Sequence, residues 1–149
     1  MPTWLPLVPA VGAVVALAAA AWVLHPRRRT ATSWPAALIF VSSAWWCLVA
    51  MLEWATGDSA ERRALEIVHV PATGTLVFGI LWYTVLFVGG RWTRRKALWL
   101  AVEPTILLVL TLTSGWQQWL IGPGGARDEP VFWAHVVYCH VALAICVGL

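Results

Sequence analysis

Long apolar runs, separated by short charged clusters, dominate this sequence of 149 residues. Each run is close to the ~20 residues that an α-helix needs to cross ~30 Å of hydrocarbon. Five runs are recognisable, at about Trp4–Leu24, Trp34–Ala55, Val68–Gly90, Ala97–Leu120 and Val131–Leu149. Because hydrocarbon offers backbone groups no partner, each run must satisfy its own hydrogen bonds, as a helix does. The sequence therefore predicts an all-α, polytopic transmembrane helix bundle of about five helices.

Composition argues against a soluble domain. Only 11% of the residues are charged and 60% are hydrophobic, whereas a soluble domain carries roughly 25% charged residues. The basic residues cluster in short loops without an aromatic-lined groove, so we expect no nucleic-acid partner. No nucleophile–base pair, phosphate-binding loop or cluster of metal ligands is recognisable. We therefore expect membrane lipid around this chain, and no catalytic residues, cofactor or metal within it.

Loop charges predict the orientation in the membrane. Arg27–Arg29 lie between the first two runs, and Arg91, Arg94, Arg95 and Lys96 lie between the third and fourth. The second and fourth loops hold only two Arg residues and one, respectively. Because cytoplasmic loops are enriched in Lys and Arg, the first and third loops should be cytoplasmic. The N-terminus should then lie outside.

Four polar residues on different predicted helices share a depth near the outer surface. They are Glu53, His69, Gln117 and His135. Each one alone is explained as an interfacial residue, whereas their shared depth predicts an outward-facing pocket. We therefore interpret these four residues as candidates for ligand binding.

Glu103 lies inside the fourth run and directly precedes Pro104. A charge at the centre of a span costs roughly 2.5–3.5 kcal/mol, and proline frees a carbonyl one turn back and can kink the helix. Glu103 can bind a proton, hydrogen-bond a neighbouring helix, or lie neutral or paired near the inner interface, and the sequence leaves these alternatives open. His140 lies near mid-membrane, about 140° around the helix from His135, so the two should not easily share one ligand.

From Trp34 to the end of the chain, polar and aromatic residues form an ordered set of motifs. The motifs are Trp46 and Glu53 in WWCLVAMLEW, WYTVLFVGGRW from Trp82 to Trp92, Glu103–Pro104 with Thr113, and FWAHVVY from Phe132 to Tyr138. Their order resembles the N-terminal seven-helix membrane region of bacterial and archaeal sensor histidine kinases. One departure is that this chain has Gln117 where the family often has a histidine.

The resemblance implies a membrane-embedded sensory input module of a signal-transducing histidine kinase, or of a diguanylate cyclase in some relatives. Within this interpretation, Glu103, Pro104, Tyr138 and His140 are candidates for switching. The resemblance also implies the cytoplasmic membrane of a prokaryote and a homodimer of the full-length protein. Since five of seven helices are expected, residues 1–149 should be a C-terminally truncated sensory region. Two helices and a cytoplasmic signalling domain with the kinase activity would be missing, and the stimulus is undefined.

A small membrane transporter or carrier subunit is the alternative interpretation. Midplane polar groups and a proline-broken helix suit such a protein. Against it, no inverted repeat is visible and the charges within the predicted spans are few.

The orientation is directly testable with reporter fusions. Fusions after Arg29 and after Lys96 should read as cytoplasmic, because these loops carry most of the Lys and Arg residues. Fusions within Gly57–Arg63 and Gly122–Glu129 should read as external. The opposite pattern would refute the assigned orientation.

Overall fold

The computed structural model describes residues 7–89, 93–113 and 130–148, and all the regular structure in these ranges is helical. The prediction of an all-α bundle is therefore confirmed. The helices are α1 (Leu7–Leu24), the short 3-10 helix η1 (Pro26–Arg28), α2 (Ser33–Ala55), α3 (Ser59–Phe87), α4 (Arg94–Leu112) and α5 (Pro130–Gly148).

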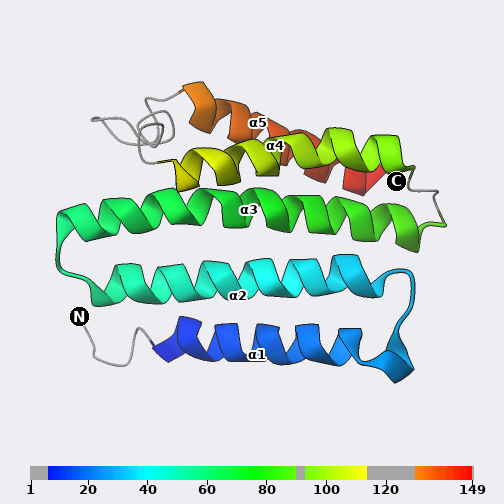
Figure 1. The fold of residues 1–149 in the computed structure, drawn as a ribbon, viewed down its shortest axis with the longest axis horizontal. Coiled ribbons are helices and arrows are strands. Elements are labelled where there is room, and N and C mark those ends of the chain that lie inside the picture. The colour runs from blue at the N-terminus through cyan, green and yellow to red at the C-terminus, as the bar shows by residue number, and fades with distance from the viewer. Residues whose placement is uncertain (1–6, 90–92, 114–129, 149) are drawn as a thin grey trace.

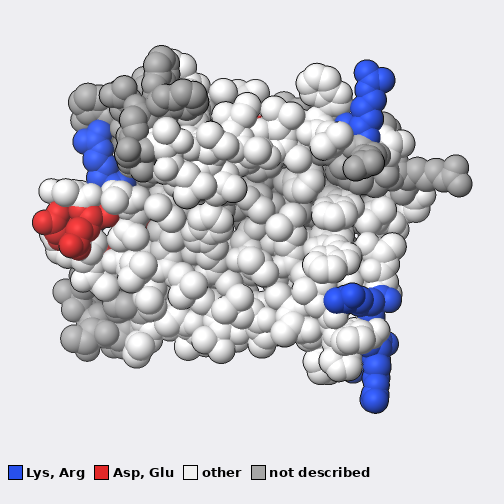
Figure 2. Space-filling view, viewed as in Figure 1, with Lys and Arg blue, Asp and Glu red and all other residues white. Residues whose placement is uncertain are grey.

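Four of these helices, α1, α2, α3 and α5, are long and apolar enough to cross a membrane. In α4 the apolar part is shorter, Leu98–Leu112, and the predicted continuation to Leu120 lies outside the described residues. Charged side chains gather at the two ends of the molecule, and the visible surface between them is almost free of charge (Figure 2). Such a band is what a protein exposes to hydrocarbon, so the chain is a membrane protein.

Successive helices run antiparallel to one another, and α3 lies at the centre of their arrangement (Figure 1). On one side α3 packs against α2, which in turn packs against α1; on the other side α3 packs against α4 and α5. We call the end where α1 joins α2 the basic end, because it holds Arg27–Arg29. The opposite end, where α2 joins α3, is called the acidic end because it holds Asp58 and Glu61.

Small residues allow the first three helices to approach closely. Ala13 and Ala16 of α1 are buried together with Ala44 of α2. A Cβ on Gly79 of α3 would lie 3.3 Å from the backbone nitrogen of Ile39 in α2. Glycine at this position therefore lets the two helix backbones meet, which is how helices associate in lipid.

The third helix begins at Ser59, nine residues before the predicted start at Val68. Asp58 caps it: its Oδ1 accepts hydrogen bonds from the backbone nitrogens of Ala60 and Glu61, at 2.6 and 3.2 Å. The first turns of α3 are polar, so hydropathy alone misses them. As a result His69, predicted at the start of the helix, lies about 15 Å along it at 1.5 Å per residue.

Candidate functional site

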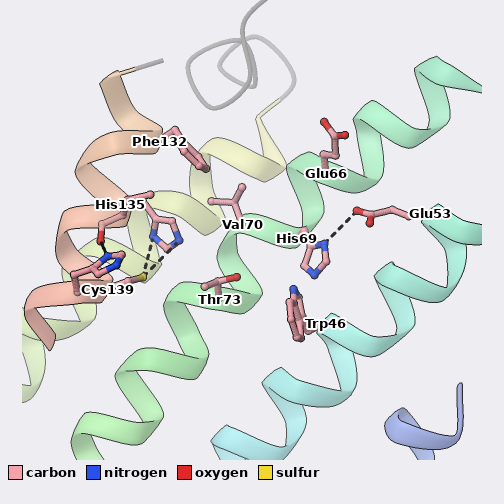
Figure 3. A pocket seen from close by; sticks show the side chains of 11 residues that line it. Trp46, Glu53, Glu66, His69, Val70, Thr73, Phe132, His135 and Cys139 are labelled. Carbon is pink, nitrogen blue, oxygen red and sulfur yellow. Dashed lines mark hydrogen bonds and ion pairs between the residues drawn. The ribbon is translucent and has the colours of Figure 1, made fainter. Parts of the chain in front are cut away.

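A cavity of about 470 Å³ lies between α2, α3 and α5 (Figure 3). Each helix contributes one face, because the lining residues recur at helical spacings of three, four or seven. The lining residues are Trp46 and Glu53 of α2, Glu66, His69, Val70 and Thr73 of α3, and Phe132, His135, Val136, Cys139 and His140 of α5. The cavity therefore combines apolar walls with several hydrogen-bonding groups.

The wall between α2 and α3 contains a histidine–carboxylate pair. His69 Nδ1 lies 3.1 Å from Glu53 Oε1, and each side chain is only 19% exposed. The ring of Trp46 lies beside His69, with 5.3 Å between ring centroids. An ionised carboxylate can only accept hydrogen bonds, so Glu53 holds the proton of His69 on Nδ1. His69 Nε2 is buried and has no hydrogen-bond partner among the described residues, which leaves it available to a ligand.

A second pair joins α4 to α5 behind the opposite wall. His135 Nδ1 lies 2.5 Å from Glu103 Oε1, and the His135 side chain is 7% exposed. The Sγ of Cys139, one turn further along α5, is 3.7 Å from both ring nitrogens of His135. Gly74 of α3 makes room for this pair, since a Cβ there would lie 3.0 Å from Glu103 Oε2. That oxygen is buried, and no residue in the described ranges hydrogen-bonds to it.

Pro104 provides a further link between the same two helices. Proline has no N–H, so the carbonyl of Leu100, one turn earlier, loses its helical donor. The Tyr138 hydroxyl of α5 donates a hydrogen bond to this carbonyl at 3.0 Å. The proline thus creates an acceptor within the span, and the tyrosine satisfies it.

The structure brings together three of the four residues predicted to bind ligand. Glu53, His69 and His135 all line the cavity, whereas Gln117 lies outside the described residues. Glu103 sits in the middle of α4 and hydrogen-bonds a neighbouring helix. Its partner is His135. The sequence analysis placed His135 among the candidates for ligand binding and Glu103 among the candidates for switching.

His140 lies at the edge of the same cavity as His135, despite the angle between them. Its Nδ1 donates a hydrogen bond to the carbonyl of Val136 at 2.7 Å, within its own helix. In the described part of the chain no group of three His, Cys, Asp or Glu side chains is placed to hold a metal ion.

The sequence interpretation missed Trp46, Glu66 and Cys139 as lining residues. A signal for them exists: Trp46 precedes Glu53 by seven residues, Glu66 precedes His69 by three, and Cys139 follows His135 by four. These spacings place each pair on one helix face. The sequence carries no comparable signal for the contact between Glu103 and His135, which lie on different helices.

The fold and the cavity define a polytopic helical membrane protein with polar groups paired inside its bundle. The family described as the N-terminal 7TM region of histidine kinase matches residues 7–149, and the chain belongs to this family. The match starts at α1 and so extends the resemblance, which began near Trp34. No curated protein and no solved structure matches the chain.

The link at Pro104 predicts a specific pattern of stabilities. Tyr138→Phe should lower the free energy of unfolding by about 0.5–1.5 kcal/mol, because it leaves the Leu100 carbonyl without a donor. In a Pro104→Ala background the same change should cost almost nothing, since residue 104 then supplies the helical N–H. Thermal unfolding of the purified chain in detergent measures both effects.

Tyr83→Phe is the matched control, because the Tyr83 hydroxyl has no hydrogen bond to any described residue. Its Tm should stay close to that of the wild type. If Tyr138→Phe lowered the free energy of unfolding equally in both backgrounds, the hydrogen bond from Tyr138 to the Leu100 carbonyl would not depend on Pro104.

Proposed function

We propose that the cavity receives the stimulus of a histidine kinase sensor region, and that its occupancy is passed on through the α4–α5 contacts. Family membership supports a membrane sensory input module. The cavity supports the location of the stimulus, because its wall contains the buried and unpartnered Nε2 of His69. This free ring nitrogen is the single observation that carries the proposal.

The two histidine–carboxylate pairs supply the means of switching. One lies between α2 and α3, the other between α4 and α5, and a histidine of each pair lines the cavity. An occupant that binds His69 Nε2 adds a second partner to the ring that Glu53 already holds through Nδ1, and an occupant that contacts His135 competes with Glu103 for its ring. A ligand shifts a two-state equilibrium only by binding the two states differently, and this competition supplies the difference.

The signal would travel along α5. Glu103 and Tyr138 hold α4 to α5 through side-chain hydrogen bonds, so weakening the contact at His135 frees α5 to move against α4. With the acidic end outside, α5 carries that movement toward the cytoplasm. The proposed output is a histidine kinase, with a diguanylate cyclase as the alternative.

The family description names seven spans, and the described residues form five long helices. The proposal therefore includes two further helices and a cytoplasmic signalling domain in the full-length protein. It also places that protein, as a homodimer, in the cytoplasmic membrane of a prokaryote. Family membership favours this sensor over the transporter considered from the sequence.

Filling the cavity tests the proposal without knowledge of the stimulus. Val136→Phe places a larger side chain in the cavity, so it should mimic an occupant and bias the bundle toward one state. A bias of about 1 kcal/mol changes a two-state ratio about fivefold. Basal autophosphorylation of the full-length protein in membranes should change accordingly, and Glu103→Gln, which weakens the contact to His135, should change it as well.

Val137→Phe is the matched control, because Val137 is the next residue on α5 and is exposed rather than lining the cavity. It should leave basal autophosphorylation unchanged at equal membrane content. If Val136→Phe and Glu103→Gln both behaved like this control, the cavity would have no part in signalling.

A further inference from the structure

A second pocket, of about 430 Å³, lies at the basic end of the bundle, opposite the cavity of Glu53 and His69. It forms where α1 passes through η1 into α2, with one side supplied by α3. The residues relevant here are Trp22, Arg28, Thr30, Thr32, Ser33 and Tyr83. None of the described residues that line this pocket is an Asp or a Glu.

Arg28 brings an uncompensated positive charge to this pocket. Its guanidinium carbon lies 3.7 Å above the ring centroid of Trp22, a cation–π contact that holds the charge in place. Among the described residues the guanidinium makes no hydrogen bond or ion pair, so its five N–H donors are free. Arg29 differs, because its Nε donates to the carbonyl of Leu24 at 3.1 Å.

Hydroxyl groups add donors beside this charge. Thr30 Oγ1 lies 3.0 Å from Thr32 Oγ1 and 3.3 Å from Ser33 Oγ. These three hydroxyls share two mutual hydrogen bonds, so one of their three hydrogens remains for another acceptor. The hydroxyl of Tyr83, on α3, also has no hydrogen-bond partner in the described part of the chain. A guanidinium with two spare O–H donors beside it, and no carboxylate among the described lining residues, suits a phosphate group.

The depth of this pocket indicates a lipid as the source of the phosphate. Trp22 and the nearby Trp34 are 60% and 55% exposed, and exposed tryptophans mark the level of the headgroups in a membrane. At this end of the molecule the uncharged band gives way to basic side chains (Figure 2). Basic pockets between helices at this level bind anionic headgroups. Without a carboxylate, the pocket cannot pair the ammonium group of a zwitterionic lipid.

We propose that this pocket binds the phosphate of an anionic phospholipid, with Arg28 as the charged donor and the hydroxyls of Thr30, Thr32, Ser33 and Tyr83 around it. The site is separate from the cavity of Glu53 and His69, so it stands or falls independently of the sensory proposal.

Native mass spectrometry of the purified 149-residue chain, titrated with phosphatidylglycerol in detergent, tests this site. One tightly bound lipid per chain should appear, and Arg28→Gln should weaken its binding about tenfold, as the loss of charge-assisted hydrogen bonds implies. Arg27→Gln is the matched control. It also removes one positive charge, but the Arg27 side chain does not line the pocket, although Arg27 is the neighbour of Arg28 in the sequence. It should change binding less than twofold.

Two further comparisons need only the wild-type protein. Phosphatidylcholine should bind at least about tenfold more weakly than phosphatidylglycerol, and excess inorganic phosphate should not displace the lipid. Equal losses in Arg27→Gln and Arg28→Gln would show diffuse attraction to the basic end and overturn the proposal. Equal binding of both lipids, or displacement by inorganic phosphate, would overturn it even if Arg28→Gln failed to fold.

Discussion

Hydrocarbon gives a buried polar group no partner except another part of the protein, and this constraint organises the second half of the structure. Glu53 pairs with His69, Glu103 pairs with His135, and Tyr138 serves the carbonyl that Pro104 leaves open. Each of these contacts joins two different helices. A polar group that would be costly alone thus becomes a specific link between neighbours, whereas α1 and α2 meet through small side chains instead.

Two buried atoms of the histidine–carboxylate pairs, His69 Nε2 and Glu103 Oε2, have no hydrogen-bond partner among the described residues. A buried unpaired polar atom costs about 1–3 kcal/mol, so a ligand or a rearrangement that satisfies it is favoured by a comparable amount. A free energy of about 1–3 kcal/mol is typical of the coupling between two sites in allosteric proteins. In a member of a sensor family, this incompleteness gives the bundle a physical reason to respond.

The sequence predicts depth well and rotation about the helix axis poorly. The predicted run at Trp34–Ala55 matches α2 to within one residue, because hydropathy changes sharply at both ends. The start of α3 was missed because its first turns are polar and depend on the cap at Asp58. Glu53, His69 and His135, which the sequence groups by depth, line one cavity in the structure. The contact between Glu103 and His135 was not predicted, because it depends on the rotation of α4 and α5 relative to each other.

Glu103 and His135 should stabilise the bundle as a pair, and a double-mutant cycle measured by thermal unfolding in detergent distinguishes such a pair from two independent side chains. Removing one partner of a fully buried ion pair costs about 3–5 kcal/mol. Glu103→Leu and His135→Leu should each destabilise the bundle by less than this, because the Glu103 side chain is partly exposed. The double variant should be much less destabilised than the sum of the two, since no buried polar group is then left alone. Strictly additive losses of unfolding free energy would contradict this pairing, because they would mean that the two side chains contribute independently.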